Sequence, residues 1–334
     1  MENMNKPSKV YTSLFMYGRF QPFTLGHKFL YDQMIRKAAE SKGGLDTSTG
    51  YNYTQLISKF AMGAVFYNQA VDNYLDEKMT ADNKPNNKPY KDGAHYTGKE
   101  HSWDEAFGYW GAASHGLGLD AKQNYDVTKM KDMAAADQNK DGVVDLKYEM
   151  NFAHAYYAAS YDKGGKTNYY NTVTQAFLDG RKIIAGAKGD ALSAKERSAL
   201  AGHIAIINEN WEKVIAESVF KYAGSVYKDI VKLEEIMASN GNTDKQFSKY
   251  GKHWGELKGF SLALQSGKGD LNDVATKLNR LIGAGPVLLN SSQVVDIDRN
   301  GNYMKDQGES WAGYMVHMVK VQKLMAENFR SRAK

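Results

Sequence analysis

The feature that most constrains the fold is an uninterrupted helical pattern that runs from Ser193 to about residue 238. Ser193 and Glu196 have the S-x-x-E spacing of a capping box, which marks the start of a helix. The face expected to be buried recurs at helical spacing and comprises Ile204, Ile207, Trp211, Val214, Ser218 and Tyr222. The run Ser-Asn-Gly-Asn at 239–242 ends the pattern. The spacing therefore predicts one long helix.

Most of the remaining chain also has a helical pattern, interrupted by a polar loop at about 80–100. We expect further helices at about 53–75, 102–112, 126–136, 146–161, 168–186, 244–266, 270–283 and 309–328. Residues 10–20 are β-branched and aromatic, which predicts one buried strand, and a short helix follows it to Glu40. We predict an all-α fold of two packed helical bundles, with a short strand–helix appendage at the N-terminus.

The domain organisation expected from these patterns is an N-terminal fragment at 1–44 and a helical domain at 45–334. A weak internal repeat divides the helical domain into halves of about 45–190 and 191–334. W-D-E-A-F-G-Y at 103–109 aligns with W-G-E-L-K-G-F at 254–260, and a histidine precedes each, His101 and His253. Duplication and a chance match both remain open.

Composition excludes several classes of function. The chain has 334 residues, 42% of them hydrophobic and 24% charged, which is enough to bury a sizeable core. It has no cysteine, so disulfides, cysteine zinc sites and thiol nucleophiles are excluded. The net charge is only +5, and the basic residues are interspersed with acidic ones, so we expect no nucleic-acid partner. No apolar run approaches the length of a membrane span.

Two histidine–carboxylate pairs could carry chemistry. In G-K-H-W-G-E, at 251–256, His253 and Glu256 are three residues apart and share one helix face. His101 and Glu105 form the second pair beside the same types of neighbour. An imidazole nitrogen and a carboxylate oxygen together suit iron or zinc. The alternative is a hydrogen bond on a helix surface.

A family resemblance rests on these motifs. H-S-W-D-E-A-F-G-Y-W-G, from His101 to Gly111, and G-x-H-x-x-E at 251–256 resemble the signatures of bacterial imelysin-like proteins of unknown function, over about residues 45–330. The resemblance implies a two-bundle helical fold, a metal site at the histidine–glutamate motif, and a role in iron acquisition. It also implies export to the periplasm or outer membrane, whereas no signal peptide is visible, so the sequence as it stands predicts a cytoplasmic location. The zinc-peptidase motif H-E-x-x-H does not occur.

Two segments have the opening of a calcium-binding loop. In D-Q-N-K-D-G-V-V-D, oxygen ligands fall at positions 1, 3, 5 and 9 with glycine at position 6. The candidate ligands are Asp137, Asn139, Asp141 and Asp145. Position 12 is Tyr148 and the acid follows at Glu149, one residue out of register. Residues 296–301 have the same opening without an acid at position 12. The alternative for both is a polar turn.

A second resemblance lies near the N-terminus. G-R-F-Q-P-F-T-L-G-H, at 18–27, resembles the phosphate-binding motif of nucleotidyltransferases of the nicotinamide-nucleotide adenylyltransferase type. The resemblance covers only about residues 10–42. It implies nucleotide contacts by Gly18, Arg19, Phe20, Thr24, Gly26 and His27, with catalytic roles for Thr24 and His27. No later β–α alternation completes such an enzyme, so the segment is interpreted as a gene-fusion remnant.

The sequence thus predicts a non-enzymatic binding protein for a metal or a small iron-containing ligand, with His101, Glu105, His253 and Glu256 as its metal ligands. Iron or zinc, and calcium at the loop, are the expected cofactors. The alternatives are adenylyl transfer through the N-terminal motif, and a purely structural or interaction protein whose motif residues lock helices together. The oligomeric state is not predicted.

Overall fold

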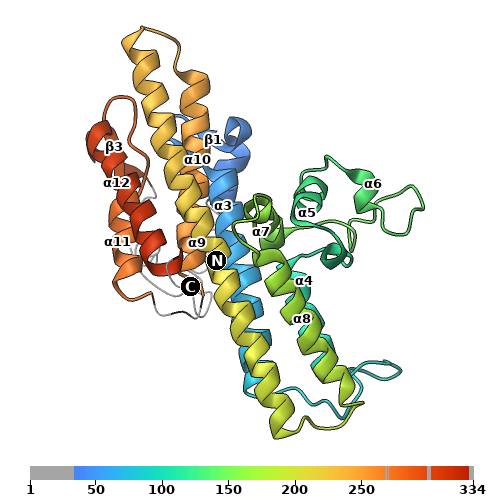
Figure 1. The fold of residues 1–334 in the computed structure, drawn as a ribbon. Helices are drawn as coiled ribbons and strands as arrows, with labels where there is room; N and C mark the ends of the chain where they lie inside the picture. Colours follow the sequence, from blue (N-terminus) through green and yellow to red (C-terminus); the bar gives the residue numbers. More distant parts are fainter. Residues whose placement is uncertain (1–33, 268, 270, 299–301, 331–334) are drawn as a thin grey trace, which may run out of the picture. The chain divides into compact units, whose positions relative to one another are not determined.

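The computed structural model describes residues 34–267, 269, 271–298 and 302–330, and it is mostly helical (Figure 1). This confirms the predicted all-α class. The nucleotidyltransferase-like motif at 18–27 and the strand predicted at 10–20 lie outside the described residues. Two small antiparallel sheets of two strands each are the only sheets in the described part of the chain. No helix in that part is both long enough and apolar enough to span a bilayer.

The chain divides into two compact units that are not consecutive halves. Unit 1 comprises the described residues of 34–63 and 216–330, and unit 2 comprises residues 64–215. The sequence patterns predict a division at about residue 190, whereas the chain passes between the two units at residues 63–64 and 215–216, both inside helical segments. One crossing lies in α9 (Ala194–Ala238) and the other in η2 (Met62–Tyr67). Domain boundaries usually fall in flexible linkers, and no linker marks either crossing.

Unit 1 is built around α3 (Tyr53–Ala61), the second part of α9, α10 (Asp244–Leu264), α11 (Asp273–Ile282) and α12 (Trp311–Met325). The short segments η1 (Lys42–Gly44) and η5 (Ala326–Arg330) flank these helices. Trp254 and Tyr314 join α10 to α12, because the indole N–H donates to the phenol oxygen at 2.8 Å. The Tyr314 hydroxyl then donates to the Ile282 carbonyl at the end of α11, at 2.7 Å. These bonds satisfy the polar atoms of two fully buried aromatic side chains.

Three glycines let α10 approach α3 and the strand before it. A Cβ atom at Gly251 would lie 2.8 Å from the carbonyl oxygen of Gly50, and one at Gly255 would lie 3.0 Å from that of Asn52. A Cβ at Gly259 would lie 2.6 Å from the Cβ of Lys59. The four-residue spacing puts all three on one helix face. The first glycine of the G-x-H-x-x-E motif therefore has a packing role.

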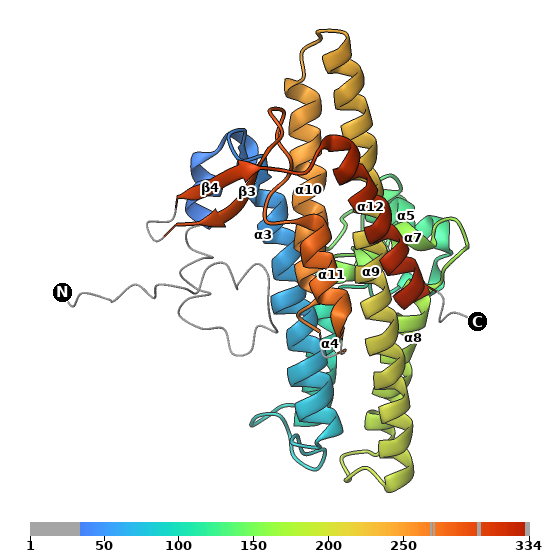
Figure 2. The same cartoon turned by 90° about the vertical axis from the view of Figure 1, so that its left-hand side faces the viewer.

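The two sheets of unit 1 lie together. β1 (Leu45–Asp46) pairs with β2 (Tyr51–Asn52), and β3 (Ser292–Ile297) pairs with β4 (Tyr303–Gln307). Figure 2 shows the β3–β4 hairpin beside the segment that carries β1 and β2. The Lys305 ammonium donates to the Ser48 carbonyl, and the hydroxyls of Tyr53 and Tyr303 are 3.0 Å apart. The β3–β4 hairpin lies between the helices expected at 270–283 and 309–328, in a stretch where the sequence patterns predict no strand.

Unit 2 begins with the second part of η2 and with η3 (Gln69–Thr80), which are both π-helical. These are followed by α4 (Gly98–Trp110), η4 (Gly116–Gly118), α5 (Ala121–Thr128), α6 (Met133–Ala136), α7 (Ala153–Asp162), α8 (Tyr169–Gly186) and the first part of α9. Its core is aromatic. The rings of Trp110 and Trp211 meet edge to face with centroids 5.0 Å apart. Trp103 donates to the Phe177 carbonyl at 2.8 Å and packs where Gly180 has no side chain.

The helix expected at 126–136 is interrupted. α5 ends at Thr128, and Met130 adopts a left-handed backbone conformation with φ of 53°. The Lys131 N–H then donates to the Asp126 carbonyl at 2.8 Å, which closes the helix end. The predicted helix at 146–161 begins only at Ala153, because the preceding residues complete a polar loop. The long helix and those at 168–186 and 244–266 are confirmed within a few residues.

Candidate functional site

His253 and Asp229 form the centre of the candidate site in unit 1. His253 Nδ1 lies 2.5 Å from Asp229 Oδ2, which joins α10 to α9. The Asp229 side chain is only 3% exposed, whereas that of His253 is 20% exposed. The amide of Gln246 also donates to Asp229 Oδ1 at 3.0 Å. A carboxylate beside Nδ1 accepts a hydrogen bond from the N–H of that nitrogen. The lone pair of Nε2 is then available to a metal.

Glu256 lies one turn further along α10, on the same face as His253. Its side chain is buried at 6% exposure, and Oε2 is fully buried with no hydrogen-bond donor among the described residues. A buried carboxylate oxygen without a donor is costly, because its lost hydration is not replaced. Such an atom calls for a bound ion or a water molecule. Glu256 is therefore the second candidate ligand beside His253 Nε2.

The pair in unit 2 has a different environment. His101 Nε2 is 3.4 Å from Glu105 Oε1, one turn apart on α4. The His101 ring packs against Tyr90, with ring centroids 3.7 Å apart. Glu105 also interacts with the hydroxyl of Tyr74, whose pKa is raised by burial and by this carboxylate. Both members of the pair are thus engaged with protein groups.

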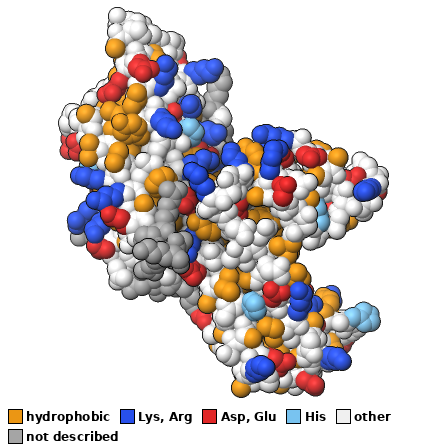
Figure 3. Space-filling model, in the orientation of Figure 1, with side chains coloured by type: hydrophobic (Ala, Val, Ile, Leu, Met, Phe, Trp, Pro, Cys, Tyr) orange, Lys and Arg blue, Asp and Glu red, His pale blue; other side chains and the backbone are white. Residues whose placement is uncertain are grey.

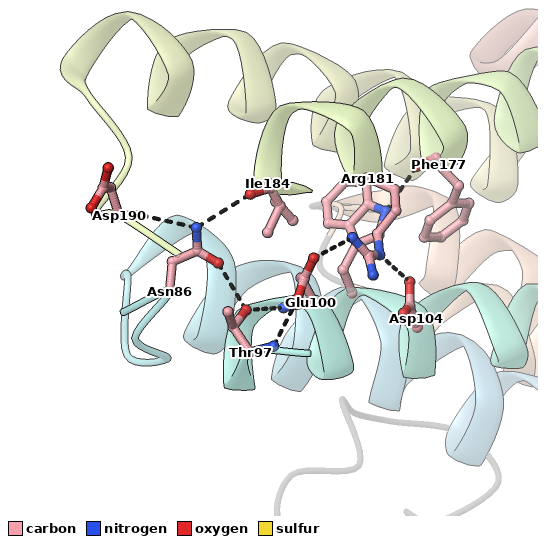
Figure 4. A network of polar contacts seen from close by, with 9 residues as sticks. Asn86, Thr97, Glu100, Asp104, Phe177, Arg181, Ile184 and Asp190 are labelled. Carbon is pink, nitrogen blue, oxygen red and sulfur yellow. Dashed lines mark hydrogen bonds and ion pairs between the residues drawn. The ribbon is translucent and has the colours of Figure 1, made fainter. Parts of the chain in front are cut away.

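Neighbouring acids of the same motif hold α4 in place (Figure 4). Arg181, on α8, donates to Glu100 Oε1 at 2.7 Å and to Asp104 Oδ1 at 2.8 Å. Glu100 also completes a capping box with Thr97, whose hydroxyl donates to Asn86 Oδ1 at 2.8 Å. One guanidinium bridges both carboxylates, so they serve the packing of α4 on α8.

The four predicted ligands belong to different units. His253 and Glu256 lie in unit 1, whereas His101 and Glu105 lie in unit 2. Within the described ranges, no group of three or more histidine, aspartate and glutamate side chains is arranged to hold a metal ion. Each pair is therefore considered by itself.

The loop at 137–149 forms a network of bonds from its side chains to its own backbone. Asp137 accepts from the N–H groups of Asp141 and Gly142, at 3.2 and 2.9 Å. Asn139 accepts from Asp141 N–H at 3.0 Å, and the buried Glu149 accepts from Asp145 N–H at 2.7 Å. The arrangement supports the predicted polar turn, and calcium binding there stays a prediction. Of the second loop, residues 299–301 lie outside the description, while Asp298 accepts from the backbone and amide of Asn302.

The comparisons with known proteins place the chain in a family. A family model described as "Domain of unknown function (DUF4856)" matches residues 37–270. The chain belongs to this DUF4856 family. The matched range includes both histidine–glutamate pairs and Asp229. Neither the curated proteins nor the solved structures yield a match.

Asp229 is the residue of the candidate site that the sequence motifs missed. It precedes His253 by 24 residues and belongs to another helix of the DUF4856 region. Its position still carries a signal, because it lies on α9 among the buried residues Val226, Ile230 and Leu233. An acidic residue in an apolar helix face needs a partner, and here the partner is His253.

Proposed function

We propose that this DUF4856 protein is a non-enzymatic binding protein that holds a metal, or a small iron-containing ligand, at His253 and Glu256. The observation that carries the proposal is the buried Oε2 of Glu256, which has no donor in the described part of the chain, on the helix face of His253. The imidazole, oriented by Asp229, and the carboxylate suit iron or zinc. The resemblance to imelysin-like proteins supports the two-bundle fold and iron acquisition as the setting.

Two protein ligands leave coordination positions for other donors. A structural zinc site has four protein ligands and a catalytic one usually has three. A site with one imidazole and one carboxylate therefore fits a metal that brings its own donors, such as water or an organic chelator. This favours iron as cargo over a permanently bound structural ion.

Metal analysis tests the proposal. We expect stoichiometric iron or zinc in the protein reconstituted with Fe²⁺ or Zn²⁺, measured by mass spectrometry. His253→Ala with Glu256→Ala should remove the metal, whereas the matched pair His101→Ala with Glu105→Ala should keep it. Asp229→Asn should weaken metal binding by about 10- to 100-fold, as loss of a carboxylate that orients a ligand does.

Three outcomes would contradict the assignment. Absence of metal from every protein after reconstitution would refute a metal site and favour the purely structural role. Equal loss in both pairs of variants would instead require all four residues that the sequence motifs singled out. A lowered melting temperature without a change in metal content would assign His253 and Glu256 to helix packing.

A second candidate function is adenylyl transfer, because the ten residues at 18–27 resemble a nucleotidyltransferase motif. An assay with ATP and nicotinamide mononucleotide tests it on the full chain. Activity that Thr24→Ala and His27→Ala abolish would support this function, and no activity in the wild type would reject it.

A further inference from the structure

Three lysines of unit 2 converge where α5 and α7 end side by side. Lys129 comes directly after Thr128, the last residue of α5, and Lys131 follows two residues later. Lys163 comes directly after Asp162, the last residue of α7. The Lys163 ammonium lies 4.4 Å from the ring centroid of Tyr125, and that of Lys131 lies 4.8 Å from it. Lys129 lies 3.8 Å from the ring centroid of Tyr156 and donates to its hydroxyl. Basic side chains gather over this part of the surface (Figure 3).

None of these ammonium groups forms an ion pair with a carboxylate in the described part of the chain. Carboxylates of the same elements have other partners. Asp126 pairs with Lys122, and Asp132 accepts from the Ala135 N–H at the start of α6. Asp162 accepts from Thr167 and from the backbone of Tyr169 and Tyr170.

The surroundings of the cluster compensate only part of its charge. Lysines near helix C-termini are favourable, because each terminus carries about half a negative charge. Two termini therefore offset about one of the three positive charges. The tyrosine rings attract ammonium groups but remain neutral. Burial raises the pKa of Tyr125, but Lys163 and Lys131 outweigh it and hold that pKa below the usual value of 10. The lowered pKa is consistent with an uncompensated positive field at the Tyr125 hydroxyl.

We propose that Lys129, Lys131 and Lys163 form a binding site for a phosphate-type dianion, with the rings of Tyr125 and Tyr156 as its walls. Lysine binds phosphate as a point charge with three donors, and several such donors suit a tetrahedral anion. The site lies in unit 2 and is independent of the metal site proposed at His253 and Glu256. Its ligand is either free phosphate or the phosphate group of an ester.

Titration calorimetry on the full chain tests the site with two probes, inorganic phosphate and phenyl phosphate. We expect saturable binding at one site per chain. Lys131→Gln with Lys163→Gln should weaken it at least about tenfold, because two charge-assisted contacts are lost. Both side chains are exposed, so the variant is expected to fold. The matched control is Lys182→Gln with Lys277→Gln, which removes two paired surface lysines.

The control separates a built site from general attraction to a basic protein. Unchanged binding in the control, with loss in the first variant, supports the site. Absence of saturable binding to either probe, or equal weakening in both variants, would overturn it. Tighter binding of phenyl phosphate than of phosphate would identify an ester whose apolar part contacts the tyrosine rings. Equal affinity would identify the free anion.

Discussion

At the residue scale, α10 carries two buried charged side chains two residues apart, Glu256 and Lys258. The Lys258 ammonium donates to the Gly283 carbonyl at 2.9 Å. Burial disfavours its charged form and lowers its pKa from 10.5 to about 8. Unfolding at pH values between these two therefore takes up a proton. The stability of the protein should accordingly rise with pH across this interval.

We predict that the free energy of unfolding increases between pH 7.5 and 9.5, at up to about 1.4 kcal/mol per pH unit from Lys258 alone. Lys258→Met should remove this slope, even though it also lowers stability by leaving the Gly283 carbonyl without this donor. Denaturant unfolding at several pH values measures both. Equal slopes in the two proteins would contradict the assignment. The upper limit of pH 9.5 excludes the titration of the tyrosines. Burial raises the pKa of Tyr314 in the folded protein. Above about pH 10 tyrosine loses its proton in the unfolded chain but not in the fold, so the folded state becomes less stable.

At the element scale, α4 and α10 share a motif but use it differently. Gly108 and Gly259 align in the sequence repeat, yet a Cβ at Gly108 would meet no atom within 4 Å. A Cβ at Gly259 would meet Lys59 and the backbone of α3. Trp103 and Trp254 also align, and they donate to a carbonyl on α8 and to a phenol on α12 respectively. The repeat therefore does not indicate equal packing in the two helices.

The two glycines should respond oppositely to alanine. We predict that Gly259→Ala destabilises the protein by about 1–3 kcal/mol, because the added methyl group forces α10 away from α3. Gly108→Ala should stabilise it by up to about 1 kcal/mol, because alanine is the better helix former and has room there. Thermal and denaturant unfolding of both variants decide the matter. A stabilising Gly259→Ala would show that the close approach of α10 and α3 is not needed.

At the scale of the whole molecule, the two units share continuous helical segments instead of a linker. α9 contributes Trp211 to the core of unit 2 and Val226 and Leu233 to that of unit 1. Because a helix gains one hydrogen bond per added residue once it is nucleated, unfolding one part of α9 weakens the adjoining part. The units are thus expected to unfold together.

We predict a single cooperative unfolding transition that is the same for probes in either unit. Trp254 and Trp311 report on unit 1, while Trp103, Trp110 and Trp211 report on unit 2. Two variants are needed, each with the tryptophans of one unit replaced by phenylalanine, so that fluorescence reports on the other unit. Comparing their fluorescence with circular dichroism measures whether the transitions coincide. Separate midpoints for the two sets of tryptophans would contradict this prediction.

Local patterns were sufficient to predict most helices. Apolar periodicity, the cap at Ser193 and the turn at 239–242 depend only on residues close together in the chain. The position of a helix and of its ends can therefore be predicted from the local sequence. The interruption at Met130 and the β3–β4 hairpin were missed, because they depend on a backbone conformation and on pairing that periodicity does not record. The division into units was also missed, since α9 and η2 are continuous across it.

The sequence by itself determined the helical class, the long helix and the histidine–glutamate pair on one face of α10. Tertiary structure alone decided the surroundings of each histidine–glutamate pair. It placed Asp229 against His253, buried Glu256 without a donor among the described residues, and engaged His101 and Glu105 with tyrosines. It also gathered three lysines from the ends of two helices. The physical reason is that burial and partner charges come from residues distant in the chain, whereas helix formation is governed by near neighbours.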